Sequence, residues 1–308
     1  MDESLILEVW DRLYQGSALD DLSLPVLDGR LDLRGISLPD PAVIRRYQTS
    51  VANVTQIEPS AKFHGVKWEN LDFSGSKLKG MRMFGCQINN CRFDKCNLED
   101  LRWWSMAVTD TSFRGANLKK SALGGIQEGR RNLYQCVDFS EADLRQTAYK
   151  SAAFENCRFF NSKLVKIDFQ GSTFTDCVFE GELREVLFHR RGFQGESYPA
   201  NEMLNIDFRG ATLRHVEFRG LSLENVQFPN DSEHLVLTNF DSALDKAIGE
   251  LKSQEDLGSR KLVAYLSVLR KWAVRNQPQG VLNTKDMIET GGLEGFRRLE
   301  KLLRALRS

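Results

Sequence analysis

The chain has 308 residues, 41% of them hydrophobic, so it is long and apolar enough to bury a large core, which excludes a disordered chain. Lys plus Arg and Asp plus Glu both number 42, so the overall charge indicates neither nucleic-acid binding nor acidic mimicry. Eighteen apolar residues never occur in a row, and the acidic start MDESLILEVW is unlike a signal peptide. We therefore expect a cytoplasmic protein without a transmembrane segment.

Residues 1–60 are predicted to form an N-terminal capping segment. Trp10 and Leu13 fall on the apolar face of a short helix at about 3–14, and LDLRGISLP at 31–39 hints at an early strand. We expect this segment to cover the first end of the structure that follows, because an open sheet end exposes unpaired backbone groups.

From residue 63 onward the sequence repeats with a period of five. A large apolar residue recurs every five positions from Phe63 to Leu123, again from Tyr134 to Phe179, and again, in a third phase, from Met203 to Phe228. Two positions earlier the residue tends to be small, and five of the six cysteines occupy this position. A period of five fits neither a helix nor a strand, so the backbone must turn a corner every five residues.

The pentapeptides ANLKK at 116–120 and ADLRQ at 142–146 carry the motif A(D/N)LXX. The repeat, which spans about 61–230, therefore resembles the pentapeptide-repeat family. The resemblance implies a mainly β fold, a right-handed quadrilateral β-helix in which four pentapeptides make one coil and coils stack about 4.8 Å apart. The inward residues expected to form its core ladder are Phe73, Leu78, Cys86, Cys91, Phe93, Cys96, Leu98, Phe113, Leu118, Phe139, Leu144, Phe154, Cys157, Phe159, Leu164, Phe169, Phe174, Cys177, Phe179, Phe208, Leu213 and Phe218.

Cys86, Cys91 and Cys96 stand five residues apart and could be read as a metal site. On such a coil they would lie on successive sides of a packed interior, where cysteine acts as a small hydrophobe. Bringing three thiolates to about 2.3 Å from one ion would open that interior, so we predict core packing and no metal. Cys157 and Cys177 are one coil apart and should stack, but a disulfide between them would distort the ladder, and the sequence leaves that pairing open.

Two interruptions, near 124–133 and 184–202, break the repeat. Loops inserted into a regular scaffold are where recognition residues tend to lie, although a charged loop is also typical of an ordinary solvated surface. Trp104 follows the inward Trp103 and should point outward, either as an interface anchor or half-buried against a neighbouring coil. The candidate interaction residues are Arg130, Arg131, His189, Arg190, Arg191 and Trp104.

Residues 231–308 lose the five-residue period and carry apolar residues at helical spacing. The last segment, LEGFRRLEKLLRALRS, is a basic amphipathic pattern, which is also typical of a helix at a membrane surface. We expect this C-terminal helical region to cap the last coil or to form a homodimer, and the family resemblance implies that dimerisation through such elements occurs.

No catalytic pattern is present in the sequence. His64, His189, His215 and His234 are dispersed, and none of HExxH, GxSxG, CxxC or GxxxxGK[ST] occurs. Carboxylates fall at outward positions, where solvation explains them. We therefore predict no enzyme, no catalytic residue and no cofactor, and keep an overlooked enzyme only as a second alternative.

The resemblance implies one further alternative, a DNA mimic that binds and protects a topoisomerase such as gyrase. Such mimics are acidic, whereas residues 61–125 hold eleven Lys or Arg against six Asp or Glu, the wrong sign for imitating phosphates. We therefore predict a non-catalytic interaction module, a rigid β-helical rod that binds another macromolecule through its faces and inserted loops. A protein partner of unspecified identity is expected, and the positive first block also allows nucleic acid.

Overall fold

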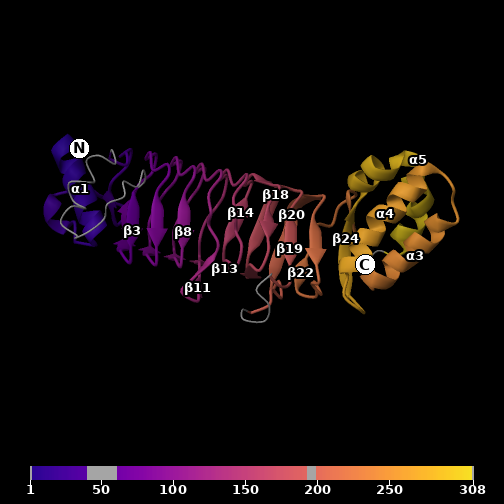
Figure 1. Ribbon diagram of the computed structural model, residues 1–308. Coiled ribbons are helices and arrows are strands. Elements are labelled where there is room, and N and C mark those ends of the chain that lie inside the picture. Colours follow the sequence, from indigo (N-terminus) through magenta and orange to yellow (C-terminus); the bar gives the residue numbers. More distant parts are fainter. Residues whose placement is uncertain (1, 40–60, 193–198, 307–308) are drawn as a thin grey trace, which may run out of the picture. The chain divides into compact units, whose positions relative to one another are not determined.

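The computed structural model describes residues 2–39, 61–192 and 199–306. It divides into two compact units, Met1–Lys163 and Leu164–Ser308, which we describe one at a time. Short parallel strands recur in both units, and helices follow the strands of the second (Figure 1). The division into 1–60, 61–230 and 231–308 that the sequence suggests stays a prediction.

The first unit contains strands that stack in register at intervals of twenty residues: β3 (Lys62–His64), β4 (Lys67–Glu69), β6 (Arg82–Phe84), β7 (Gln87–Asn89), β8 (Arg102–Trp104) and β9 (Ala107–Thr109). One side runs from β3 through β6 to β8, and the next from β4 through β7 to β9, all in parallel. Single bridges continue the other two sides, from Asp72 to Arg92 and from Lys77 to Asn97. One coil therefore contains four pentapeptides, which confirms the predicted four-sided β-helix.

Each side of a coil ends in a corner where the backbone adopts a positive φ. Asn, Asp and Gly enter this left-handed region at the lowest energetic cost, which explains why such residues recur two positions after each large inward residue. The corners of one complete coil are Gly65 (φ 64°), Asn70 (φ 56°), Gly75 (φ 73°) and Gly80 (φ 78°).

The interior of the first unit is filled by side chains stacked one coil above another. Phe73, Phe93, Phe113 and Phe139 form one column, with successive ring centroids 5.1, 5.1 and 5.4 Å apart and ring planes within 10° of parallel. The residues that the sequence assigns to the core ladder are buried in both units, with the exception of Phe218.

The first coil is covered by helix α1 (Glu3–Gln15), which begins at the cap Asp2 and ends at Gly16. The Trp10 indole donates a hydrogen bond to the carbonyl of Ser37 at 2.9 Å, and the Tyr14 ring stacks on Phe63 at 4.2 Å. Buried apolar side chains on one helix face thus close this end of the coils.

Strands already occur before residue 61, where the sequence hints at one. After the short helix η1 (Asp20–Leu22), strands β1 (Val26–Leu27) and β2 (Arg30–Asp32) pair antiparallel, and β2 pairs in parallel with β5 (Leu71–Asp72). The described residues 2–39 therefore contain strand pairing with the first coil as well as a helix.

The first interruption is an antiparallel hairpin of β10 (Ile126–Gln127) and β11 (Arg130–Arg131). Across it the coil spacing rises from twenty to twenty-six, because Ala107 of β9 pairs with Leu133 of β12 (Leu133–Gln135). The next step, from β12 to β13 (Ala153–Glu155), is twenty again, and β14 (Arg158–Phe160) follows. The six additional residues leave the stack as a hairpin without breaking its register.

The second unit has coils of the same kind with a less regular spacing. Paired residues are nineteen apart between β16 and β19, thirty apart between β19 and β21, and twenty apart between β20 and β22. Part of the predicted 184–202 interruption lies outside the described residues. The strands are β15 (Leu164–Val165), β16 (Asp168–Phe169), β17 (Thr173–Thr175), β18 (Val178–Arg184), β19 (Leu187–His189), β20 (Ile206–Arg214), β21 (Glu217–Arg219) and β22 (Val226–Gln227).

The second unit ends in an antiparallel strand pair and helices: β23 (His234–Thr238), α3 (Phe240–Lys252), α4 (Leu257–Trp272), β24 (Gln279–Asn283) and α5 (Thr284–Ala305). β23 and β24 pair antiparallel, and the helices share a core that includes Leu244, Leu262 and Leu299. The Asn283 side chain caps α5 by accepting hydrogen bonds from the Lys285 and Asp286 N–H groups. None of the helices in the described ranges is long and apolar enough to cross a membrane.

Phe218 departs from the predicted core ladder because it is only half-buried. It stacks on Phe188 at 5.4 Å, but β21 is the last strand of its sheet, so no further strand covers the other side of the ring. The repeat pattern marks Phe218 as inward, and it cannot show that the stack of strands ends there.

Candidate interaction surface

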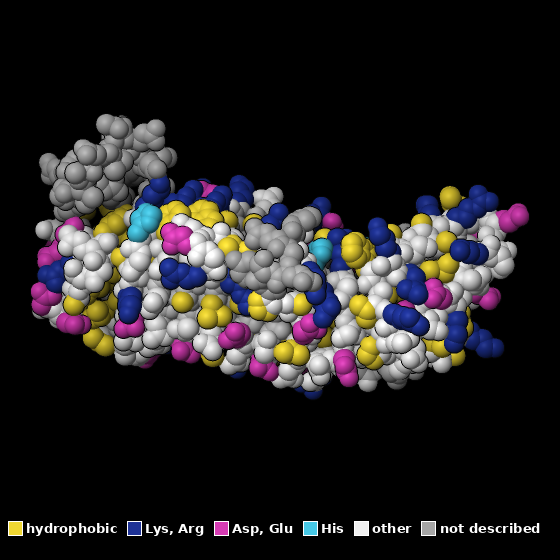
Figure 2. Space-filling model, turned by 60° about the horizontal axis from the view of Figure 1, so that its bottom comes forward, with side chains coloured by type: hydrophobic (Ala, Val, Ile, Leu, Met, Phe, Trp, Pro, Cys, Tyr) yellow, Lys and Arg dark blue, Asp and Glu magenta, His cyan; other side chains and the backbone are white. Residues whose placement is uncertain are grey.

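The cationic surplus of the first unit is gathered on two adjoining sides of its coils. One is the side built by β3, β6 and β8, and the other precedes it along each coil and is bridged at Lys77 and Asn97. These two sides hold seven cations but only two acids between residues 61 and 125, and the other two sides hold four of each. Figure 2 shows Lys and Arg side chains bordering a group of hydrophobic ones on the drawn face. We call this the basic surface; its cations are Lys62, Lys77, Lys79, Arg82, Arg102, Lys119 and Lys120.

The two acids of the basic surface each face two cations. Glu99 lies 3.5 Å from Lys79 and 3.4 Å from Lys120, and the hydrogen bond from Lys120 followed by the charge of Lys79 lowers the pKa of its carboxyl. Asp100 lies between Arg82 and Arg102, at 3.0 and 2.6 Å. Lys119 lies 3.3 Å from Asp143 of the next coil, which is also paired with Arg145. Because each of these acids is shared by more than one cation, the surface keeps a positive charge.

Aromatic rings form an outward column along the same side. His64, Phe84 and Trp104 end β3, β6 and β8, and their ring centroids are 4.7 and 5.0 Å apart with planes within 10° of parallel. His64 is exposed and the other two are half-buried. Trp104 therefore points outward and is half-buried against a neighbouring coil, and its role as an interface anchor stays a prediction. We call these three residues the aromatic column.

The hairpin β10–β11 ends the aromatic column. A Cβ added to Gly125 would lie 3.1 Å from Cδ1 of Trp104, and the Ser105 hydroxyl donates a hydrogen bond to the carbonyl of Gln127 at 2.8 Å. Arg130 is exposed, and Arg131 is half-buried. The structure thus brings Trp104, Arg130 and Arg131 together on the first unit. Trp104 belongs to the regular repeat and the two arginines to the inserted hairpin, and the sequence alone did not connect them.

The other predicted candidates lie in the second unit, where His189 and Arg190 face acids. His189 Nε2 is 3.0 Å from Asp168, whose pKa this contact lowers, and Arg190 is 2.7 Å from Glu202. Arg191 is exposed. The sequence did not connect His189 with Asp168, which lies on β16, the strand that pairs with β19 at a nineteen-residue step. It also did not show that Glu202, in the same predicted interruption as Arg190, pairs with it.

The three clustered cysteines point into the interior, each with its thiol on a backbone carbonyl. Cys96 Sγ is 2.9 Å from the carbonyl oxygen of Phe73, and Cys91 Sγ is 3.3 Å from that of Asn89. Burial raises the pKa of Cys91 and of Cys96 to about 12 and also raises the pKa of Cys86. Their burial is what the core-packing interpretation expects of small apolar side chains.

We expect a thiol reagent such as Ellman's reagent at pH 8 to modify one cysteine in the native protein, Cys136, because it is exposed while the other five are buried. In denaturant six thiols should react. The Cys136→Ser variant should lose the native reaction; rapid labelling of that variant would contradict the buried assignment, and only four thiols in denaturant would reveal a disulfide.

One group in the described part of the chain has metal-binding spacing. The ligand atoms of His215, Asp286 and Glu289 lie within 4.8 Å of one another. Arg214 already occupies both carboxylates, with Nε 2.7 Å from Asp286 and a terminal nitrogen 2.5 Å from Glu289. These contacts join β20 to α5, and the arginine competes with any divalent cation there. We therefore interpret the group as an ion-pair cluster.

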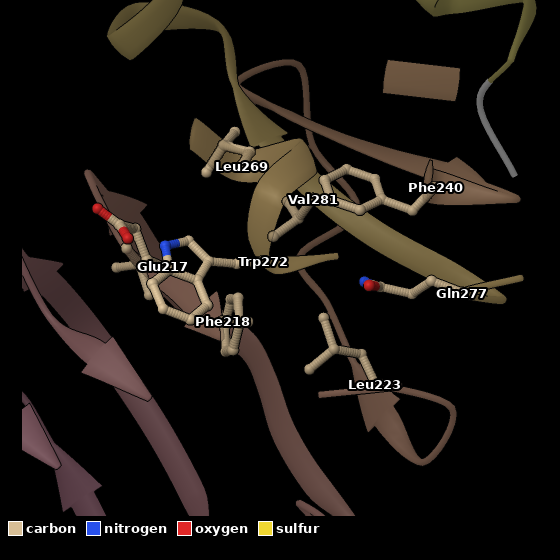
Figure 3. A pocket seen from close by; sticks show the side chains of 9 residues that line it. Glu217, Phe218, Leu223, Phe240, Leu269, Trp272, Gln277 and Val281 are labelled. Atoms are coloured by element: carbon tan, nitrogen blue, oxygen red, sulfur yellow. The ribbon is translucent and has the colours of Figure 1, made fainter. Parts of the chain in front are cut away.

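Cavities lie close to this cluster in the second unit. Figure 3 shows the smaller, where Trp272, Phe218 and Leu223 converge; its volume of about 20 Å³ has room for about one water. The larger, about 260 Å³, lies beside His215 and Tyr265 and opens to solvent. Arg219 lies over the Trp272 ring at 5.0 Å, which stabilises the contact between β21 and α4.

Comparison with known proteins identifies the repeat. Residues 138–176 match the family model of pentapeptide repeats in eight copies. A solved structure of trypsin-treated QnrB1, a plasmid-mediated fluoroquinolone resistance protein, is 20% identical over 61% of this chain and 90% of that chain, with a TM-score of 0.27. HetL, a pentapeptide repeat protein involved in heterocyst differentiation regulation from the cyanobacterium Nostoc sp., is 12% identical over 62% of this chain and 94% of that chain, with a TM-score of 0.26. No curated protein matches the chain.

Proposed function

This chain is a pentapeptide-repeat protein, and on that premise we propose that it is a non-catalytic interaction module that binds an anionic protein partner through the basic surface. The observation that carries the proposal is the segregation of charge. All of the cationic surplus between residues 61 and 125 lies on two adjoining sides, while the other two sides are balanced. Random placement of outward residues would spread that surplus over all four sides.

The regular coils support binding without rearrangement. The cations stand on strands or corners whose backbone spacing is fixed by parallel pairing, so a partner meets them already in place. A preformed surface loses little conformational entropy on binding. The remaining positive charge, shared among few acids, attracts an anionic partner over about one Debye length, roughly 8 Å at physiological salt.

The acidic DNA mimic is the alternative that the charge distribution favours least. A mimic needs acids gathered on one face, and the basic surface gathers the opposite charge, whereas the remaining two sides hold equal numbers of each sign between residues 61 and 125. Capture of a topoisomerase that persists after the basic surface is reversed would nevertheless restore the mimic.

The proposal is tested by affinity capture from a nuclease-treated lysate of the source organism. The bait is the tagged full-length protein, compared with the double variant Lys77→Glu and Lys79→Glu, both exposed on the basic surface. We expect the wild-type protein to retain one stoichiometric protein partner and the variant to retain less than about a tenth of it, because adjacent charges reverse at the interface.

The matched control reverses two exposed lysines on the balanced sides, Lys67→Glu and Lys95→Glu. It changes the net charge by the same amount and should capture the partner as the wild type does. Equal loss in both double variants would show that only net charge matters, and undiminished capture by the Lys77 and Lys79 variant would refute the basic surface as the binding site.

A further inference from the structure

The basic surface carries two parallel columns on the side built by β3, β6 and β8. Lys62, Arg82 and Arg102 are outward one position before each inward residue, and the aromatic column stands one position after it. Two residues along a strand span about 7 Å, so that is the separation of the two columns. Along each column the repeat distance is the coil spacing, shown by ring centroids 4.7 and 5.0 Å apart.

Stacking within the aromatic column uses both ring faces of its middle member. Phe84 is stacked between His64 and Trp104, and Gly125 lies close to the Trp104 ring, because a Cβ added there would be 3.1 Å from its Cδ1. His64, at the start of the column, is exposed. Proteins that bind single-stranded nucleic acid offer open ring faces on which bases stack, and a duplex backbone needs cations but no apolar column. The aromatic column therefore presents mainly ring edges to a partner, and ring edges pack well against aliphatic or aromatic side chains.

In the column of Lys62, Arg82 and Arg102, which we call the cationic column, hydrogen bonds hold the two arginine side chains in position to bind acids. The Arg82 guanidinium bonds both the carboxylate and the backbone carbonyl of Asp100, and Arg102 bonds the carbonyl of Lys120 at 2.6 Å and the Asp100 carboxylate. Two guanidinium groups share one carboxylate, so donor capacity and a positive charge remain. Bidentate acceptance by carboxylates is the geometry that arginine favours.

We propose that the partner contacts this surface with an acidic amphipathic segment, in which Asp or Glu residues form one edge and apolar residues the other. The acids would bind the cationic column, and the apolar residues would pack against the aromatic column. One face of a helix or strand can present two such rows of side chains at the separation of the two columns. This inference rests on the proposed function and adds the chemistry of the partner to it.

The test uses three fluorescein-labelled probes on the full-length protein, followed by fluorescence anisotropy at about 0.1 M salt. The first is a synthetic 21-residue Glu/Leu/Ala peptide with heptad order, the second has the same composition in shuffled order, and the third is a 20-nucleotide single-stranded DNA. We expect the ordered peptide to bind at least tenfold more tightly than the other two, because it alone presents an acidic and an apolar edge together.

Phe84→Ser removes the middle ring of the aromatic column. The matched control, Phe160→Ser, removes a half-buried outward phenylalanine on another side of the coils. Phe84→Ser should weaken the ordered peptide about tenfold and leave the shuffled peptide unchanged, while Phe160→Ser should change neither. Circular dichroism of both variants checks that the fold is intact, and a milder Phe84→Leu replaces Phe84→Ser if it is not.

The outcomes separate the two proposals. If all three anions bind equally, depend on Lys77 and Lys79 and ignore Phe84, the basic surface stands and the amphipathic segment is wrong. Tightest binding of the DNA with dependence on Phe84 makes the partner a nucleic acid and overturns the inference. If no probe binds above background, both the inference and the proposed anionic partner fail.

Discussion

Replacing Phe93 with alanine is expected to lower the free energy of unfolding by about 3–5 kcal/mol, whereas Phe84→Ala should lower it by less than about 1.5 kcal/mol. Each ring is stacked between two others at nearly equal spacing, 5.1 Å on each side for Phe93 and 4.7 and 5.0 Å for Phe84. The two rings point in opposite directions from the coil: Phe93 points inward and is fully buried, whereas Phe84 points outward and is half-buried.

The physical reason for the contrast is the cavity. Removing the Phe93 ring leaves a hole between coils that cannot close, since parallel pairing holds the coils at a fixed distance. Removing the Phe84 ring leaves a gap that water fills. Urea unfolding followed by tryptophan fluorescence measures both changes, and equal losses would contradict the assignment of one column to the core and the other to the surface.

Replacing Arg214 with methionine is expected to destabilise the second unit by about 3–5 kcal/mol. The Asp286 side chain is 2% exposed, and its carboxylate accepts hydrogen bonds from Arg214 at 2.7 Å and from the His215 N–H at 2.6 Å. Without the guanidinium group, a buried charge loses its main partner. Because Asp286 lies in the first turn of α5, the loss should release the contact between that helix and β20.

Arg270→Met is the matched control, since Arg270 pairs with Asp245 at 2.8 Å but both side chains are substantially exposed, at 35% and 58%. An exposed pair contributes at most about 1 kcal/mol, so this variant should unfold almost as the wild type does. Hydrogen exchange in α5 locates the effect of Arg214→Met. A second substitution, Asp286→Leu, should recover part of the lost stability; no recovery would mean that the stranded carboxylate is not its cause.

The candidate surface was only partly predictable, as the aromatic column illustrates. The sequence placed Trp104 outward because it follows an inward residue, and it marked Arg130 and Arg131 as inserted. It did not connect Trp104 with His64 and Phe84, because an alternation of inward and outward residues does not indicate which outward residues stack. The parallel pairing of β3, β6 and β8 makes that connection.

The distribution of charge over the sides of the coils was also not predictable from the sequence. Counting along residues 61–125 yields a surplus of five cations, which is weak evidence when spread over four sides. Pairing at intervals of twenty residues assigns each charge to a side, and only then does the whole surplus fall on two neighbours. His189 and Arg190 looked equally promising in the sequence, yet Asp168 and Glu202 face them in the folded second unit.

By itself the sequence determined the coil, because a large inward residue every five positions and corner residues between them satisfy only a backbone that turns at each pentapeptide. The same pattern determined the burial of the cysteines at the small inward positions. Tertiary structure decided which strands pair where the coils begin and which outward side chains become neighbours. Residues 31–38 illustrate the first point, because they pair with residues forty positions further along the chain. The reason is that a local period constrains the direction of each side chain, whereas neighbours across coils depend on the length of every insertion between them.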